Sequence, residues 1–357
     1  MDLCLAVAVS MLPASRGPVS AVFKALRQHL PDVTLEDVID ALGMMGIGAQ
    51  AAAGEARARA ERALEAAPAA GATPLAWFDP RYPALLGCIA DPPPVLWVKG
   101  CLDVLDARAI AIVGSRAATG YALDVGYRLA SELAGRGAVV VSGLARGVDS
   151  AAHRGCLDAG GATVAVLGSG VDRIYPAEHG ELAATIEKQG VLVSELAPGA
   201  PPLAEHFPLR NRIISGISLA VVVVEASEKS GSLITGRCAM EQGRDVMAVP
   251  GSVLSGRNRG SHALLKDGAK VVETADDILE DLGAWTARLP AVSTRKSLTE
   301  DPLLAHLDAG EACALDTLVE RTGMTPSKLL MRLTELELRG QVTRAPGGGF
   351  ARVSVRR

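Results

Sequence analysis

The stretch that decides the fold is Ala109-Ile-Ala-Ile-Val-Gly-Ser-Arg116, a short apolar run that ends in a glycine, a serine and an arginine. An unbroken apolar run of this length is typical of a strand that is buried on both faces of a parallel sheet. A helical pattern over 123–133 follows it, and a second apolar run comes at 138–141. This alternation predicts βαβ units.

The same alternation continues along the chain. Further apolar runs lie at 163–167, 191–193, 219–224 and 245–249, with helical patterns between them, for example over 233–242. The segment before the first run, 82–100, predicts an extended lead-in with one strand at 95–98. We therefore expect an α/β fold with a doubly wound, mostly parallel sheet, which binds its ligands at the carboxyl ends of the strands.

Both flanks of this region have a different pattern. Residues 1–66 predict a small helical domain, with apolar residues at helical spacing at 22, 26 and 30 and again at 35, 38, 39 and 42. Its first apolar stretch, Leu3 to Leu12, follows Asp2 instead of a positive residue, which predicts a buried helix and not an export signal. An Ala/Pro/Gly stretch at 67–74 predicts a linker to a second domain over 75–283.

The C-terminal part predicts a winged helix-turn-helix domain over 301–357, behind a linker at 286–300. Helices are expected over 303–307, 315–322 and 326–339, and short strands around 341–344 and 350–353. Lys and Arg exceed Asp and Glu in 301–357 by only one, eight against seven. A small excess of positive charge is only a weak sign of DNA binding by this domain. It gives little support to the hypothesis that the protein is a winged-helix transcription regulator with a ligand-sensing sheet.

Composition limits the kind of site. The net charge is −4 and aromatic residues make up 3%, so a nucleic-acid site must be a local cluster of cations that reads phosphates more than bases. The six cysteines contain no CxxC pair, which argues against a zinc ribbon or a disulfide framework and indicates a reducing cytoplasm. No stretch approaches the roughly 18 apolar residues of a membrane span. We expect no metal, because Asp149 and His153 have no apparent third ligand, and no cofactor, because neither GxGxxG nor a Walker A loop follows the first strand.

Four loops after predicted strands each combine small residues with a donor or a cation. Glycine lets the backbone approach a phosphate, a helix start supplies free amides, and arginine offers a fork of donors. One such loop is weak support, but four at one edge of a sheet predict a groove for a polyanion. The candidate ligands are Gly114, Ser115, Arg116, Gly143, Arg146, Phe207, Arg210, Asn211, Arg212, Lys229, Ser230, Gly231 and Ser232.

Several of these residues also have a purely structural interpretation. Arg116 could be solvated, or could clamp its loop to Glu225 or Asp149. One of Arg210 and Arg212 could instead hold its loop to Glu195 or Glu225.

Asp149 and His153, spaced i and i+4, could form a catalytic or metal pair. We favour the structural alternative, in which Asp149 caps a helix and His153 is packed inside, because no third ligand or nucleophile is near them in the sequence.

With these loops established, the chain resembles the DprA/Smf family (DNA-processing protein A). The resemblance covers about 75–283 and rests on motifs at 113–116, 142–149, 152–153, 175–176, 194–195, 207–212, 230–235 and 249–251. The chain departs from the family pattern at three positions. Ala122 stands where the family usually has glycine, and His262 stands where it usually has asparagine. Ala204 lies where some members have lysine.

The resemblance implies an extended Rossmann-like domain that binds single-stranded DNA without cutting it and that forms a homodimer. It also implies that the protein protects incoming strands and delivers them to the recombinase RecA in natural transformation and recombination. It assigns the DNA phosphates to the loops at 114–116, 207–212 and 230–232. The main alternative from another class is a nucleotide hydrolase of the lysine-decarboxylase-like group. That group is marked by Pro-Gly-Gly-x-Gly-Thr, whereas here Pro250-Gly251 is followed by Ser252-Val253.

Overall fold

The computed structural model describes residues 3–12, 34–42 and 47–283, and in the C-terminal part residues 303, 313–322, 324–325, 328–330, 332–333, 336, 342–344 and 349–352. The chain forms two compact units, Met1–Val292 and Ser293–Arg357, and each is described by itself.

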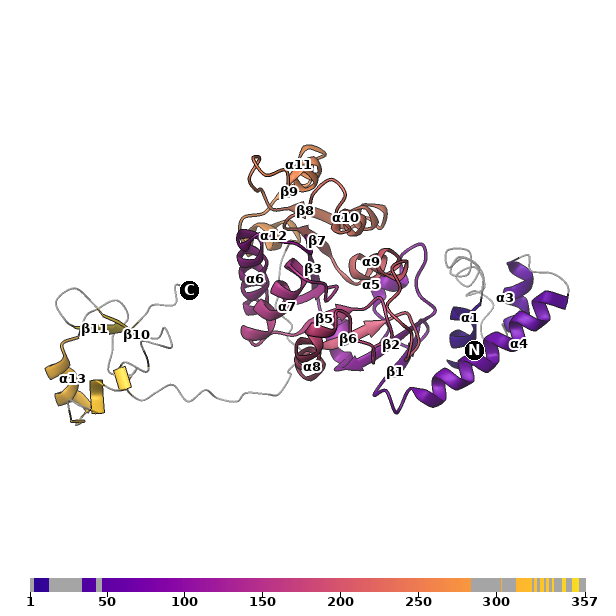
Figure 1. Cartoon of the computed structure of the whole chain (residues 1–357), viewed down its shortest axis with the longest axis horizontal. Helices are drawn as coiled ribbons and strands as arrows, with labels where there is room; N and C mark the ends of the chain where they lie inside the picture. Colours follow the sequence, from indigo (N-terminus) through magenta and orange to yellow (C-terminus); the bar gives the residue numbers. More distant parts are fainter. Residues whose placement is uncertain are drawn as a thin grey trace. The chain divides into compact units, whose positions relative to one another are not determined.

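The first unit is built on a nine-stranded sheet in the order β1-β2-β6-β5-β4-β3-β7-β8-β9, shown in Figure 1. The strands are β1 Thr73–Ala76, β2 Val95–Gly100, β3 Ala109–Val113, β4 Val139–Ser142, β5 Thr163–Val166, β6 Val191–Ser194, β7 Ala220–Val223, β8 Asp245–Ala248 and β9 Lys270–Val271. In the part of the sheet that runs from β6 through β5, β4, β3, β7 and β8 to β9, each strand is parallel to its neighbours. The predicted doubly wound sheet is confirmed.

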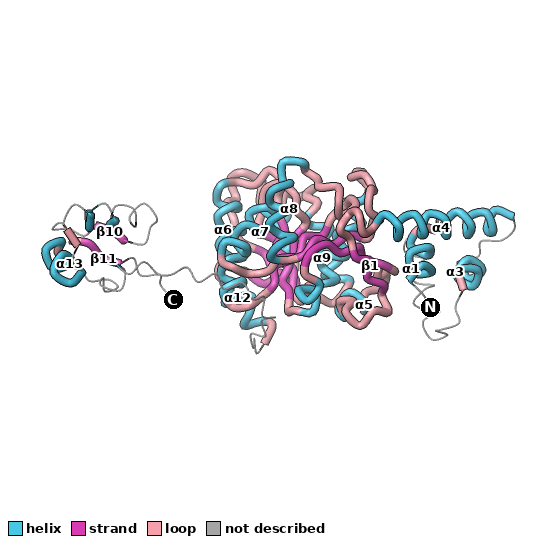
Figure 2. The backbone as a smooth tube through the Cα atoms, turned by 90° about the horizontal axis from the view of Figure 1, so that it is seen from below, coloured by secondary structure: helices cyan, strands magenta, loops and turns pink. Residues whose placement is uncertain are grey.

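The central strand shows why the sheet is covered on both faces. Along β3, Ala111 and Val113 belong to one buried apolar cluster, and Ile110 and Ile112 belong to another on the opposite face. Helices lie on both sides of the strands (Figure 2). Helices α6 (Gly120–Gly135), α7 (Val148–Asp158) and α12 (Ala275–Asp281) contribute to one cluster, and α5 (Ala84–Gly87), α9 (His206–Ile217) and α10 (Ser232–Glu241) to the other. A strand enclosed in this way needs apolar residues at every position.

The edge of the sheet differs from the prediction. Residues 67–74 were expected to be a linker, but Thr73 already pairs with Val98 as the first residue of β1. Strands β1 and β2 are antiparallel to each other, and β2 is antiparallel to β6. A four-residue strand that contains Pro74 gives no strand signal in the sequence, and proline is tolerated there because β1 is an edge strand.

The N-terminal helices are α1 (Leu3–Ser10), α3 (Leu35–Ala41) and α4 (Ile47–Ala66). Helix α1 is buried along Ala6–Val9, as predicted for a structural helix, and its cluster includes Trp97 of the sheet. The apolar positions predicted at 22, 26 and 30 lie outside the described residues. The boundary between 1–66 and 75–283 therefore stays a prediction. No helix in the described ranges has the length and apolar character needed to span a membrane.

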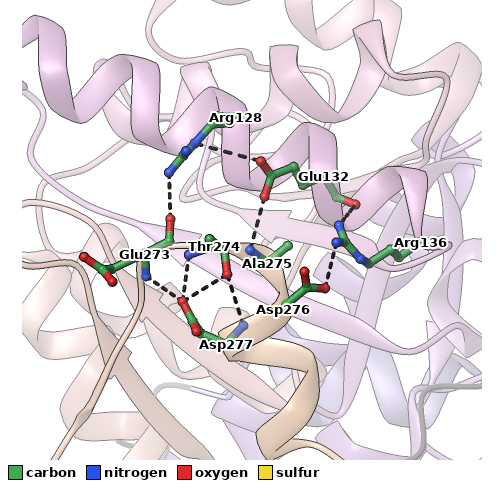
Figure 3. A network of polar contacts seen from close by, with 8 residues as sticks. All are labelled: Arg128, Glu132, Arg136, Glu273, Thr274, Ala275, Asp276 and Asp277. Atoms are coloured by element: carbon green, nitrogen blue, oxygen red, sulfur yellow. Dashed lines mark hydrogen bonds and ion pairs between the residues drawn. The ribbon is translucent and has the colours of Figure 1, made fainter. Parts of the chain in front are cut away.

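A polar network fastens the last helix of this unit to α6 (Figure 3). Arg128 Nη2 donates to the Glu273 carbonyl over 2.6 Å, and Arg136 pairs with Asp276 over 2.7 Å. Thr274 and Asp277 form a capping box at the start of α12. Exposed pairs of this kind contribute little individually, but together with the buried Ile278 and Leu279 they hold the end of the unit in place.

The described part of the first unit also contains the helices α8 (Gly180–Gln189) and α11 (Arg259–Lys266) and the short 3-10 helices η2 (Leu102–Asp106) and η3 (Ala177–His179). The second unit contains α13 (Leu315–Thr322) and the antiparallel strands β10 (Val342–Arg344) and β11 (Phe350–Arg352) around one apolar cluster. The helix predicted over 315–322 and the two short strands are confirmed. The linker at 286–300 and most of the helix at 303–307 lie outside the described residues, and the helix at 326–339 is described only in part.

Candidate nucleic-acid interface

A cavity of about 630 Å³ opens at the carboxyl edge of the parallel strands. Its walls come from the loops that follow β3, β4, β5 and β7 and from the segment between β6 and α9. Of the predicted ligands, Gly114, Ser115, Arg116, Phe207, Arg210, Asn211, Ser230, Gly231 and Ser232 line it. Loops far apart in the sequence meet here because parallel strands end at the same edge of a sheet.

Arg116 is exposed at the mouth of the cavity. Its guanidinium carbon lies 5.4 Å from the centroid of the Phe207 ring, which is cation–π range. The structure shows no ion pair between Arg116 and a carboxylate of the described chain. Glu225, one of the two clamps considered above, instead accepts hydrogen bonds from the Thr119 hydroxyl over 2.7 Å and the Thr119 amide over 3.3 Å. Arg116 therefore lines the cavity with a guanidinium that no described carboxylate pairs with.

Arg210 lies deeper in the wall and is buried. Its Nη1 donates to the Val166 carbonyl, its Nε has no hydrogen-bond partner, and no carboxylate of the described residues lies within ion-pair distance. Burial lowers the pKa of Arg210 to about 10, Asp149 opposes this shift, and the nearby charge of Arg116 adds to it. Arg210 still carries its charge at neutral pH. A buried cation with unfilled donors is costly unless an anion reaches it.

Gly143 serves this arginine and does not line the cavity. A Cβ at this position would lie 2.0 Å from Arg210 Nη1, so glycine is required for the guanidinium to fit against β4. The Asp149 carboxylate accepts the Gly143 amide over 3.1 Å and the Ala145 amide over 3.4 Å. Burial raises the pKa of Asp149, and Arg210 opposes this rise.

The expected helix-capping role of Asp149 is wrong. The N-cap of α7 is Gly147 and has no side-chain cap bond; the Asp149 carboxylate bonds the loop that precedes the helix. The packed position predicted for His153 is confirmed. Its ring accepts the Leu144 amide over 3.3 Å and lies 2.8 Å from the Thr163 hydroxyl, and burial lowers the pKa of His153 to about 3. Within the described ranges no group of three His, Cys, Asp or Glu could hold a metal ion.

Arg212 is turned away from the cavity. It pairs with Asp91 over 2.8 Å and with Glu195 over 2.7 Å, and its side chain is 9% exposed. The structural alternative with Glu195 is therefore the one observed for Arg212. The reason is helical geometry, because residues two apart on α9 point about 200° apart, so Arg210 and Arg212 cannot face the same ligand.

Two further predicted cations also lie outside the cavity lining. Arg146 is exposed and pairs with Glu178 over 2.6 Å, and Lys229 is exposed on the loop before α10. The rest of that loop is part of the wall. Asn211 Nδ2 donates to the Gly231 carbonyl over 3.2 Å, and the hydroxyls of Ser230 and Ser232 are 2.8 Å apart. A Cβ on Gly231 would meet nothing within 4 Å, so its backbone faces open space.

Sequence reasoning missed Tyr175 as a site residue. Tyr175 lines the cavity, and its ring centroid lies 5.4 Å from that of Phe207. Phe207 was among the predicted ligands, and the structure places a second aromatic ring beside it. The available signal was the position of Tyr175 after β5, at the same edge of the sheet as the other loops.

Comparison with known proteins decides the family. Residues 73–283 match the family model described as DNA recombination-mediator protein A, and residues 287–348 match the DprA winged helix domain. The chain belongs to the DNA recombination-mediator protein A family. The resemblance stated from the motifs is thereby confirmed, as is the winged helix domain.

Relatives agree with this assignment. The chain is 42% identical to protein Smf of Escherichia coli over 277 aligned residues. The alignment covers 75% of this chain and 74% of the relative. The chain is 46% identical over 203 residues to the DNA processing protein DprA of Bacillus subtilis, covering 57% and 68% of the two chains.

Two solved structures of DprA are similar to this fold. The one from Streptococcus pneumoniae has a TM-score of 0.71 and 34% identity, covering 79% of this chain and 98% of that chain. The one from Helicobacter pylori, described by its single-stranded DNA binding mode, has a TM-score of 0.52 and 30% identity, covering 56% and 92%.

Proposed function

We propose that this chain binds single-stranded DNA in the cavity at the carboxyl edge of its sheet and carries out no chemistry on it. The observation that carries the proposal is Arg210, a buried cation with no carboxylate of the described residues within ion-pair distance, which lines the same cavity as the exposed Arg116. Both guanidiniums can bind phosphate oxygens through charge-assisted hydrogen bonds. The Helicobacter pylori relative, named for its single-stranded DNA binding mode, supports this assignment.

The walls favour a single strand over a duplex. Phe207 and Tyr175 offer ring faces inside the cavity, and a base can stack on them only when it is not enclosed in a base-paired stack. Stacking tolerates any base, so we expect little preference for sequence. The phosphates supply most of the affinity.

The first prediction concerns salt. Fluorescence anisotropy with a labelled oligonucleotide should show tight binding of the single strand and much weaker binding of a blunt duplex of the same sequence. The log–log slope of affinity against salt should be about −1.4 or steeper, since two phosphates are neutralised by Arg116 and Arg210 at ~0.7 each. A flat salt response, or equal affinity for the duplex, would contradict the proposal.

We infer that the site is not catalytic. Asp149, the acidic residue in the described lining, accepts two loop amides, and Glu225, outside the lining, accepts the hydroxyl and amide of Thr119. The nucleotide hydrolase alternative is tested by incubating the protein with nucleoside monophosphates. We expect no release of free base, and release above the level of an Arg116→Ala control would favour the hydrolase.

We further propose that the protein acts in the cytoplasm as a homodimer, protects incoming strands and helps to load RecA in natural transformation and recombination. The family description as a recombination mediator supports this role. The experiment is RecA filament assembly on a single strand, with and without this protein. We expect faster assembly with the full chain, and no acceleration with Arg116→Ala if the strand must first be bound in the cavity.

The second prediction concerns the tail. Residues 293–357 form a separate compact unit, and all the described residues that line the cavity precede residue 236. A chain that ends at Gly283 should therefore keep its single-strand affinity to within a few-fold. The measurement is anisotropy on both chain lengths under the same salt. A loss of more than about tenfold, or about 1.4 kcal/mol, would place the winged helix in the binding site.

A further inference from the structure

The loop between β8 and α11, residues 249–258, lies directly against the walls of the cavity. Arg257 Nη1 donates to the carbonyl of Ala117 over 2.8 Å, and Ala117 is one of the lining residues. Helix α11, which follows the loop, is held beside the cavity by the Gly260 amide, which donates to the Ala226 carbonyl over 2.8 Å, next to the lining residue Ser227. The loop therefore continues the cavity edge beyond β7, toward the β8 side of the sheet.

The base of this loop is held in place. Asn258 is buried, and its Nδ2 donates to the Ser252 carbonyl over 3.2 Å. A Cβ on Gly251 would lie 2.3 Å from Asn258, so the two ends of the loop are in close contact. His262 Nε2 lies 3.0 Å from the Gly251 carbonyl. The tip of the loop is thus presented by a packed base.

The tip itself is apolar and faces solvent. Val253 is 79% exposed and Leu254 is 93% exposed, which makes them the most exposed large apolar side chains of the described residues. We call this pair the apolar tip. Two adjacent aliphatic side chains on a packed base, beside a ligand cavity, form a contact surface of the kind that a partner covers.

The charge around the tip suits a polyanion. Arg257 and Arg259 follow it, and no Asp or Glu occurs from Val249 to Lys266. Arg257 is exposed and uses one nitrogen for the Ala117 carbonyl, so its other donors can reach a phosphate. Arg259 lies 3.7 Å from Glu228, and both side chains are more than half exposed, so a phosphate can compete for this weak pair.

We propose that a single strand leaving the cavity passes over the β8–α11 loop, where Arg257 binds a phosphate and the apolar tip packs against a base. This inference rests on the proposed function and extends its site. A cavity of about 630 Å³ has the size of an ordinary small-ligand pocket and holds only a short piece of strand. The β8–α11 loop is a neighbouring surface that combines a cation with exposed apolar groups.

The test compares short and long strands on the full-length protein. The variant carries Val253→Ser and Leu254→Ser together, and the probes are oligothymidylates of 4 and 25 nucleotides. We expect the affinity for the 25-mer to fall about fivefold, because the serine side chains remove the apolar contact with a base, and the affinity for the 4-mer to stay within twofold. Arg257→Ala should reduce the salt slope for the 25-mer by about 0.7.

Met240→Ser is the matched control. Met240 is 52% exposed and lies near the C-terminal end of α10, away from the cavity edge where that helix begins. It should change neither affinity. All variants should melt within a degree or two of the unaltered protein, because exposed side chains contribute little to the packed core.

Each contrary outcome separates the two proposals. Unchanged affinity of the double variant for the 25-mer, with binding still lost in Arg116→Ala, overturns the extended path and leaves the cavity site intact. Equal loss for both lengths also overturns it, because the tip would then belong to the cavity. If light scattering shows that the double variant changes only self-association, a second copy covers the tip and the inference is wrong. If the unaltered protein binds neither strand, the proposed function itself fails.

Discussion

Replacing Arg116 with alanine should weaken single-stranded DNA binding at least tenfold and leave the melting temperature almost unchanged. Arg116 is exposed at the cavity mouth, forms no ion pair with a described carboxylate, and contacts Phe207 only through its ring face. An arginine whose role is to bind a ligand adds little to the free energy of unfolding of the DNA-free protein. Removing a charge-assisted, bidentate contact costs about 1.5–3 kcal/mol, which corresponds to a tenfold loss or more.

The lysine variant separates charge from geometry. Arg116→Lys keeps the charge but loses the planar fork, so it should weaken binding only in part. The matched control is Arg146→Ala, which removes another exposed arginine, one that pairs with Glu178 and does not line the cavity. It should change affinity by less than about twofold. A destabilised Arg116→Ala protein with unchanged affinity would defeat the assignment.

Arg212→Ala should give the opposite result, a large loss of stability. The substitution removes the ion pair of Arg212 with Glu195, in which both side chains are 9% exposed, and the ion pair with Asp91. Breaking a buried pair from one side costs roughly 3 kcal/mol, or a fall in melting temperature of roughly 6–12 °C for a unit of this size. Thermal unfolding without DNA is the measurement.

Affinity decides whether Arg212 is also a ligand. Measured well below the melting temperature, single-strand binding by Arg212→Ala should fall much less than in Arg116→Ala, because Arg212 does not line the cavity. A normal melting temperature combined with a tenfold loss of affinity would return Arg212 to the DNA site.

The strands of the parallel sheet could be predicted because burial on both faces leaves a continuous apolar run in the sequence. The cavity loops could be predicted for the same reason, since each follows such a run and all strands end at one edge. The edge strand β1 could not, because its four residues include Pro74 and are identified only by their pairing with β2.

The roles of the arginines needed the structure. Whether a cation faces a ligand or a carboxylate depends on partners distant in the sequence, such as Glu178 for Arg146 and Glu195 for Arg212. One part could have been foreseen, because two arginines separated by one residue on a helix face opposite sides. Which of them faces the cavity depends on how α9 packs.

Photo-crosslinking to a single strand containing 5-iodouracil, followed by mass spectrometry of the linked peptides, tests the cavity assignment most directly. The aromatic residues that line the cavity, Tyr175 and Phe207, are the expected sites of crosslinking. We expect the linked peptides to contain these residues or the neighbouring walls at 113–117 and 227–235, and to disappear with Arg116→Ala. Crosslinks confined to residues 293–357, or unaffected by Arg116→Ala, would contradict the claim that the strand binds in this cavity.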